Sequence, residues 1–346
     1  MRTAELPQLA FERQRESLRQ SLDNFNRKQP VSLCSYRRNL ALESPRYSVD
    51  ELAAALETTT LADVAAFQKA LLPEALLEAF VIGNFDETEA LGMVDAITAN
   101  LPSSAPLPPD QIPRRKSRVL PVGRSLRQFV APNPDEANSA TEVYLQIGMD
   151  RGDDWLHMAF ISQLIDQPFY EQLRTQQQLG YIVQCGIGET DGVRSFVLSV
   201  QSSVLQPPQV EERVDTFLTG FREKLAKLTE AELDTQREAL AVQATDIDKR
   251  LGQQSGRLWS EIARRRYDYD RPWRTAKRAR KVTREGLLAF YDRVLLPGSP
   301  EGRRLSTHIF AKKAAPTALV LDALPDEFYP PTEDRSAKLR SAAVKA

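Results

Sequence analysis

The chain has 346 residues, of which 42% are hydrophobic and 27% are charged, which is enough for two domains that each have a core. Its 46 basic and 47 acidic residues nearly cancel, so no overall field favours nucleic acid or an anionic membrane as a partner. No apolar run approaches the roughly 18 residues of a membrane span, and the first ten residues do not resemble a signal peptide. We therefore expect a cytoplasmic protein with no nucleic-acid partner and no membrane partner.

The two histidines of the chain limit the metal chemistry that it could perform. His157 is followed by MAFI and His308 by IFAK, so neither has a second ligand one helical turn further on. A catalytic zinc site normally uses two or three imidazoles with a carboxylate, in motifs such as H-x-x-E-H. We therefore predict structural roles for both histidines and no metal site on this chain.

Helical signals dominate the first part of the chain. Apolar residues recur at helical spacing between Phe11 and Lys28, and we expect Pro30 to end that helix. Three further helix starts carry a capping pattern, in which an acidic residue follows a Ser, Thr or Asp by three positions. These pairs are Ser48 with Glu51, Thr60 with Asp63, and Asp86 with Glu89.

One strand is expected among these helices, from Leu76 to Ile82. A single strand cannot pair its own edges, so it needs a sheet that the preceding sequence does not supply. Either another polypeptide completes this sheet, or the chain is a truncated product. We predict an incomplete, mostly helical domain over residues 1–124, with a proline-rich connector at residues 102–113.

The second predicted domain spans residues 125–313 and mixes strands with helices. Alternating apolar residues predict strands at Arg127 to Val130 and Thr141 to Met149, and a hairpin turning at Asp191-Gly192. Amphipathic helices follow, and Leu305 to Phe310 closes the sheet. This order predicts an α+β fold. Residues 314–346 lose the pattern, and we expect them to be disordered.

The stretch from Pro168 to Val183, PFYEQLRTQQQLGYIV, joins a predicted helix to a predicted strand through a polar turn. Its residues Arg174, Leu179, Gly180 and Tyr181 resemble the L-R-T-x-E-Q-L-G-Y segment of the insulysin, pitrilysin and nardilysin family of zinc metallopeptidases (inverzincins). The segments SLDNFNRKQP and SGRLWSEIARRRYDYDR also resemble that family, in the same order. The resemblance covers about Phe11 to Lys313 and corresponds to the C-terminal portion of such an enzyme.

This resemblance implies two pitrilysin-like domains of antiparallel sheet covered by helices, the first one incomplete at its N-terminus. It also implies that Arg174 and Tyr181 bind peptide substrate, with Tyr181 stabilising the oxyanion. Spacing alone favours a plainer interpretation, in which Arg174 pairs with carbonyls at its helix end and Tyr181 packs at a strand edge. The family commonly has an acidic residue where this chain has Gln177, so an ion pair to Arg174 from that position is in doubt.

The functional hypothesis is therefore a substrate-chamber half of an insulysin-like zinc metalloendopeptidase that degrades peptides. Zinc is expected on a missing N-terminal half, supplied in cis or in trans, and the chain alone is predicted to be inactive. The alternative is a non-catalytic peptide-binding or scaffold relative of the family. Nucleic-acid binding through Arg114 to Lys116 is a third and weaker hypothesis, because short basic runs are usually solvated.

Overall fold

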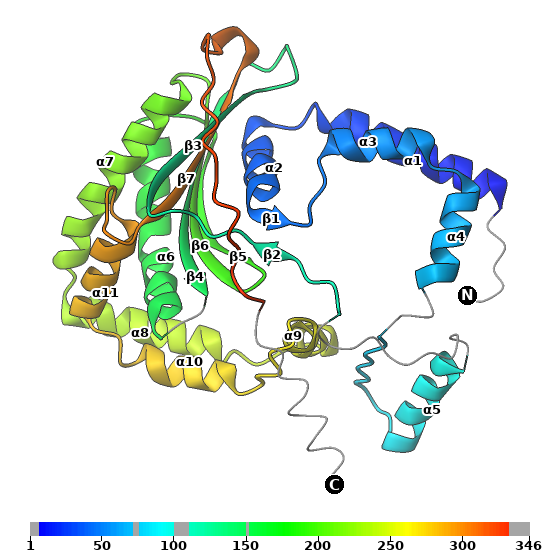
Figure 1. Ribbon diagram of the computed structural model, residues 1–346. Helices are drawn as coiled ribbons and strands as arrows, with labels where there is room; N and C mark the ends of the chain where they lie inside the picture. Colours follow the sequence, from blue (N-terminus) through cyan, green and yellow to red (C-terminus); the bar gives the residue numbers. More distant parts are fainter. Residues whose placement is uncertain (1–6, 72–75, 100–110, 150–151, 332–346) are drawn as a thin grey trace. The chain divides into compact units, whose positions relative to one another are not determined.

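The computed structural model describes residues 7–71, 76–99, 111–149 and 152–331, and most of the connector at residues 102–113 lies outside them (Figure 1). The chain divides into two compact units that each combine separated segments. The first unit draws on Met1–Phe25, Tyr47–Arg114 and Asp248–Ala263, and the second on Asn26–Arg46, Arg115–Ile247 and Arg264–Ala346. No helix in the described residues is both long enough and apolar enough to cross a membrane.

The first unit is helical in the residues that the structure describes. Capping boxes formed by Ser48 with Glu51 and by Asp86 with Glu89 start two of its helices, as the sequence predicts. Thr60 and Asp63 exchange the equivalent hydrogen bonds. The helices are α1 (Gln8–Phe25), α3 (Val49–Thr58), α4 (Leu61–Leu71), α5 (Glu87–Thr98) and α9 (Leu251–Ala263).

The strand expected at Leu76 to Ile82 is not formed. These residues are extended but pair with no strand among the described residues of the first unit. No side chain of α1, α3, α4 or α5 is buried in the described structure. The expectation was wrong because a strand needs a neighbour to pair with its backbone hydrogen-bonding groups, and the described part of the first unit contains none.

Helix α2 (Pro30–Leu42) belongs to the second unit, and the sequence analysis missed it. Pro30 was expected to end a helix, but it occupies the first turn of the next one, where its missing N–H costs nothing. Val31, Leu33, Cys34 and Leu42 are buried on this helix. Residues 26–46 therefore cluster with the sheet of the second unit, although the sequence placed them in the range 1–124.

The second unit is built on a five-stranded sheet in the order β3-β7-β4-β6-β5. All neighbouring strands are antiparallel except β3 and β7, which run parallel, so the sheet is mixed and not wholly antiparallel. The predicted hairpin turns at Asp191 and Gly192, both with positive φ. The strands are β3 (Gly123–Val130), β4 (Ser139–Met149), β5 (Ile182–Thr190), β6 (Val193–Ser202) and β7 (Arg303–Phe310).

Helices cover both faces of this sheet and confirm the α+β class (Figure 1). One face carries the main core, which contains Phe160, Phe169, Phe196, Phe217 and Phe290. Helix α2 packs on the other face, against β4, β7 and β6. The covering helices of the main core are α6 (Asp154–Tyr170), α7 (Pro207–Ala226), α8 (Glu230–Ala244), α10 (Arg271–Ala279) and α11 (Arg284–Phe290).

The segment from residue 314 to residue 331 is ordered in the structure, contrary to the expected disorder. The backbone N–H of Gln128 in β3 donates to the carbonyl oxygen of Val320, and the backbone N–H of Asp322 donates to that of Leu126. Further along, the backbone N–H of Tyr329 donates to the carbonyl oxygen of Ser117 at 2.8 Å. Pairing with an edge strand needs no hydrophobic periodicity, so the sequence carried no signal for it. Residues 332–346 lie outside the described residues.

Candidate functional site

The joint between α6 and β5 contains Arg174 and Tyr181, the two residues that the sequence selects. Helix α6 continues into a π-helical turn, Glu171–Gln176, and β5 begins at Ile182. Leu173 and Leu179 are buried in the main core, and the backbone N–H of Leu179 donates to the carbonyl oxygen of Leu173 at 3.0 Å. These two leucines pack into the core on both sides of the turn, so the polar residues between them are fixed relative to the sheet.

Gly180 allows this joint to pass close to the neighbouring strand. A Cβ atom at this position would lie 1.9 Å from the carbonyl oxygen of Gln201 in β6, far inside contact distance. Gln178, two residues earlier, has a φ of 51°, which turns the chain sharply before it enters β5. The motif L-G-Y therefore has a physical basis: a buried anchor, a close backbone approach, and an outward-facing phenol.

Arg174 lies between two tyrosine rings. Its guanidinium carbon is 5.3 Å from the ring centroid of Tyr170 and 5.1 Å from that of Tyr181. Its Nε donates to the carbonyl oxygen of Tyr181 at 3.2 Å. The structure thus brings the two predicted residues together and adds Tyr170, which the sequence analysis missed. The sequence did contain an indication of this contact: Tyr170 precedes Arg174 by four residues, a spacing that makes two side chains neighbours on a helix.

The outer atoms of this group are available to a ligand. Tyr181 is 83% exposed, and its hydroxyl makes no hydrogen bond with any described residue. The two terminal nitrogens of Arg174 likewise form no hydrogen bond or ion pair within the described part of the chain. The arrangement can therefore present a fixed fork of donors and one phenolic donor to carbonyl or carboxylate oxygens.

Gln177 does not take the place of an acidic partner for Arg174. No ion pair to Arg174 occurs within the described residues, and the Oε1 atom of Gln177 is buried there without a hydrogen-bond donor. The carbonyl that Arg174 donates to belongs to Tyr181, next to the start of β5, and not to the end of its own helix, so the plainer interpretation does not describe this contact. The exposed ring of Tyr181 is also not packed into the strand edge.

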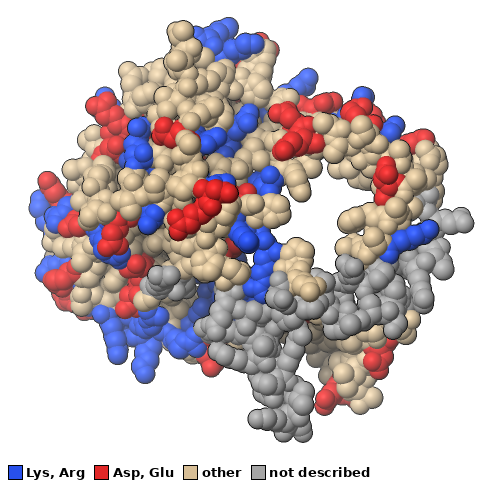
Figure 2. Space-filling view, in the orientation of Figure 1, with Lys and Arg blue, Asp and Glu red and all other residues tan. Residues whose placement is uncertain are grey.

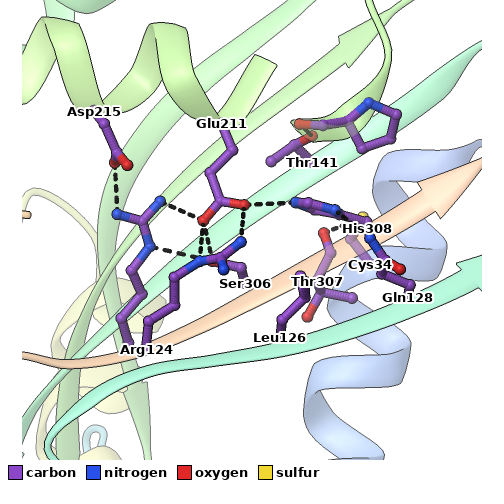
Figure 3. Close-up of polar contacts among 12 residues, drawn as sticks. Cys34, Arg124, Leu126, Gln128, Thr141, Glu211, Asp215, Ser306, Thr307 and His308 are labelled. Carbon is purple, nitrogen blue, oxygen red and sulfur yellow. Dashed lines mark hydrogen bonds and ion pairs between the residues drawn. The ribbon is translucent and has the colours of Figure 1, made fainter. Parts of the chain in front are cut away.

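A second polar cluster lies between α7 and the strands β3 and β7, and the sequence analysis missed it (Figure 3). Glu211 accepts hydrogen bonds from Arg124 at 2.9 and 2.7 Å, from Arg304 at 2.6 Å and from His308 at 2.8 Å. Ser306 also donates to it. The sequence signal was the alternation of Arg304, Ser306 and His308, which puts all three on one face of β7.

The charge state of this cluster follows from its contacts. Burial alone raises the pKa of Glu211, but the hydrogen bonds from His308 and Arg124 and the charge of Arg304 outweigh it, so its pKa lies well below 4.5. Gln128 receives a hydrogen bond from Val320 on Oε1, so its amide nitrogen faces Nδ1 of His308. The proton of a neutral His308 therefore sits on Nε2, where it is donated to Glu211.

Both histidines are thus placed in structural settings. His157 lies against the ring of Phe290, with centroids 5.8 Å apart, and burial lowers its pKa. Across the described residues, no group of three or more His, Cys, Asp or Glu side chains is arranged to hold a metal ion. The donor set therefore does not fit the zinc of a metallopeptidase, and we assign no chemical step to such an ion here.

The comparisons with known proteins agree with the motif. The chain is 30% identical to human insulin-degrading enzyme over 317 residues, which is 90% of this chain and 31% of that relative. It is 28% identical to a nardilysin-like protein of Arabidopsis thaliana over 300 residues, covering 86% of this chain and 29% of that protein. The chain belongs to the insulysin, pitrilysin and nardilysin family of metallopeptidases.

The fold comparison shows that the chain shares its fold with part of a solved pitrilysin structure. A crystal structure of pitrilysin matches with a TM-score of 0.77 and 21% identity, over 98% of this chain and 35% of that one. Residues 160–259 match the family model described as PQQ synthase PqqF-like, C-terminal lobe domain 4. This insulysin-family chain therefore spans about a third of the length of the relatives that it matches.

Proposed function

We propose that this chain is the substrate-chamber half of an insulysin-like zinc metalloendopeptidase that degrades peptides. In this role it binds the peptide, while hydrolysis needs a zinc-bearing N-terminal half supplied in cis or in trans. The observation that carries the proposal is the Arg174 guanidinium, which contacts two tyrosine rings and whose terminal nitrogens form no hydrogen bond or ion pair within the described residues. By itself the chain is expected to be inactive, because no group of three or more His, Cys, Asp or Glu side chains in the described residues could hold a metal ion.

The chemistry of the pair suits an extended peptide. The planar fork of Arg174 can donate to backbone carbonyl oxygens, and the exposed hydroxyl of Tyr181 adds one directional donor beside it. A donor aimed at an oxygen that gains charge during the reaction typically contributes about 3 kcal/mol to catalysis. Tyr181 is therefore proposed as the oxyanion stabiliser, and Arg174 as the residue that holds the peptide in place.

Peptide binding by the chain alone is the first test. Fluorescein-labelled insulin B chain would be titrated with the wild type and with Arg174→Ala and Tyr181→Phe, using fluorescence anisotropy. Loss of the charged donors of Arg174 should weaken binding about tenfold or more. Arg213→Ala and Tyr47→Phe remove the same groups from other exposed positions and should bind as the wild type does. Equal binding by all variants would contradict the proposal.

Cleavage is the second test. The chain would be combined with the separately produced zinc-bearing N-terminal half of an insulysin-family enzyme, and hydrolysis of the same peptide would be followed by mass spectrometry. Restored cleavage that falls in Arg174→Ala and Tyr181→Phe supports the proposal. Peptide binding without cleavage in the combined sample favours the alternative, a non-catalytic peptide-binding or scaffold relative.

A further inference from the structure

The near-zero net charge of the chain conceals a strongly basic segment. Residues 264–284 contain ten Lys and Arg residues and only two acidic ones, Asp268 and Asp270, although the chain as a whole carries a net charge of −1. The segment begins after α9 and includes all of α10, which lies in the second unit. Figure 2 shows Lys and Arg side chains gathered over α10, on a part of the surface that projects outward and is not hollowed.

Helix α10 turns one side to the protein and the other to solvent. Thr275, Ala276 and Ala279 are buried, and the helix packs against α8. Trp273, Arg274, Lys277 and Arg278 are exposed on the solvent side of the helix, and Arg280 and Lys281, the two residues that follow it, are also exposed. We call these six residues the α10 surface. Within the helix, Trp273 and Lys277 lie one turn apart, and Lys281 follows two residues after the helix ends at Ala279.

Only part of this positive charge is neutralised by neighbouring carboxylates. Arg280 pairs with Glu238 at 2.9 and 2.8 Å, and Arg278 donates from Nε to Asp153 at 2.8 Å. Arg274 is held by Asp268. Lys277 and Lys281 form no hydrogen bond or ion pair with any described residue.

Carboxylates from outside the segment also pair with its cations, among them Glu189, Asp153, Glu238 and Glu285. The ion pairs on α10 are exposed, so they are weak and can exchange for other anions.

Trp273 distinguishes this surface from an ordinary solvated charge run. Its side chain is 60% exposed, although an indole ring is among the costliest groups to leave in water. An apolar ring beside lysines on the outer face of a helix is the arrangement of helices that lie on an anionic bilayer, with the indole at the level of the headgroups. Single-stranded nucleic acid is instead bound in a positively charged groove with several stacking rings.

We infer that the α10 surface docks this protein on an anionic lipid surface. The lysines and arginines bind headgroup phosphates, and Trp273 enters the interface between headgroups and acyl chains. The inference does not depend on peptide binding, because Arg174 and Tyr181 lie between α6 and β5 and do not belong to the α10 surface. It adds a membrane-surface partner that neither the net charge nor the hydropathy of the chain indicates.

Flotation with lipid vesicles tests the inference on the full chain. Binding is expected to vesicles of phosphatidylcholine mixed with phosphatidylglycerol, to be absent with phosphatidylcholine alone, and to fall as salt is added. Lys277→Gln combined with Lys281→Gln should lower the vesicle affinity about 30-fold, and Trp273→Ala should lower it further. Lys312→Gln with Lys313→Gln removes two exposed lysines from another place in the second unit and should leave binding unchanged.

Circular dichroism establishes that each variant is folded before the comparison is made. The inference is overturned if phosphatidylglycerol vesicles are not bound at low salt, or if both lysine pairs have the same effect. A duplex DNA oligonucleotide provides the competing class of partner. Should the chain bind that DNA while leaving the vesicles in solution, the α10 surface is a nucleic-acid site and the membrane assignment is wrong.

Discussion

Arg174 contacts Tyr181 twice, through a hydrogen bond from Nε to the main-chain oxygen at 3.2 Å and through the ring, whose centroid is 5.1 Å from the guanidinium carbon. Two contacts of different kinds restrict both the position and the tilt of the guanidinium. A group fixed in this way loses little side-chain entropy when it binds a ligand. The two contacts therefore hold the guanidinium donors of Arg174 in place before a peptide binds.

Tyr170 should support Arg174 in peptide binding. Its ring lies 5.3 Å from the guanidinium carbon and is 44% exposed, so removing it should affect the orientation of Arg174 more than the stability of the fold. We expect Tyr170→Ala to weaken binding of the labelled peptide about threefold, the effect of losing one exposed cation–π contact. Tyr170→Phe keeps the ring and should bind as the wild type does. Equal losses in both variants would show that the hydroxyl, and not the ring, matters.

Gly180 should tolerate no side chain. The Cβ atom of Gly180→Ala would lie 1.9 Å from the carbonyl oxygen of Gln201, so the joint or β6 must shift. We expect a loss of about 1–3 kcal/mol in the free energy of unfolding, as for other overpacked sites, together with weaker peptide binding. Urea denaturation measures the first effect. Gly186→Ala is the matched control in β5, where no atom lies within 4 Å of the added Cβ, and its stability should not fall.

Glu211 should make the stability of the second unit sensitive to acid. Its pKa in the folded state lies below 4.5, so its contribution is complete above that value and is lost as the pH falls further. Glu211→Gln should cost about 3–5 kcal/mol near neutral pH, because two arginines lose their buried partner. The deficit relative to the wild type should shrink as unfolding is measured at more acidic pH. Glu212→Gln, exposed on the same helix, should show neither effect.

Arg38 should hold α2 on the sheet. Its Nη1 lies 2.9 Å from Oε1 of Glu142, a carboxylate whose pKa is raised by burial in spite of that arginine. Arg38→Ala leaves this carboxylate buried without its cation and should destabilise the fold by about 3–5 kcal/mol in urea denaturation. Replacing both partners, in Arg38→Met with Glu142→Leu, should restore most of the loss. Failure of the double variant to recover would mean that Ser35, which also donates to Glu142, carries part of the docking.

Local patterns identified most helices and strands correctly. The capping pairs that begin at Ser48 and Asp86 each start a helix, because the hydrogen bonds that satisfy a helix end involve residues only three positions apart. The turn at Asp191-Gly192 joins β5 to β6 for a similar reason. Contacts that depend on distant residues were missed. Helix α2 is stabilised by a sheet that begins some eighty residues later, and the strand expected at Leu76 to Ile82 has no neighbour to pair with.

The sequence by itself determined the α+β class, the two candidate residues Arg174 and Tyr181, and the family to which they point. The fold class follows from short spacings along the chain, and the two candidate residues follow from the resemblance of their motif to that family. Only the tertiary structure decided that Tyr170 completes their group, that Glu211 binds Arg124, Arg304 and His308, and that the cations of the α10 surface are exposed beside Trp273. The physical reason is that ion pairs and stacked rings depend on distances in space, which the fold sets only after strands far apart in the sequence have paired.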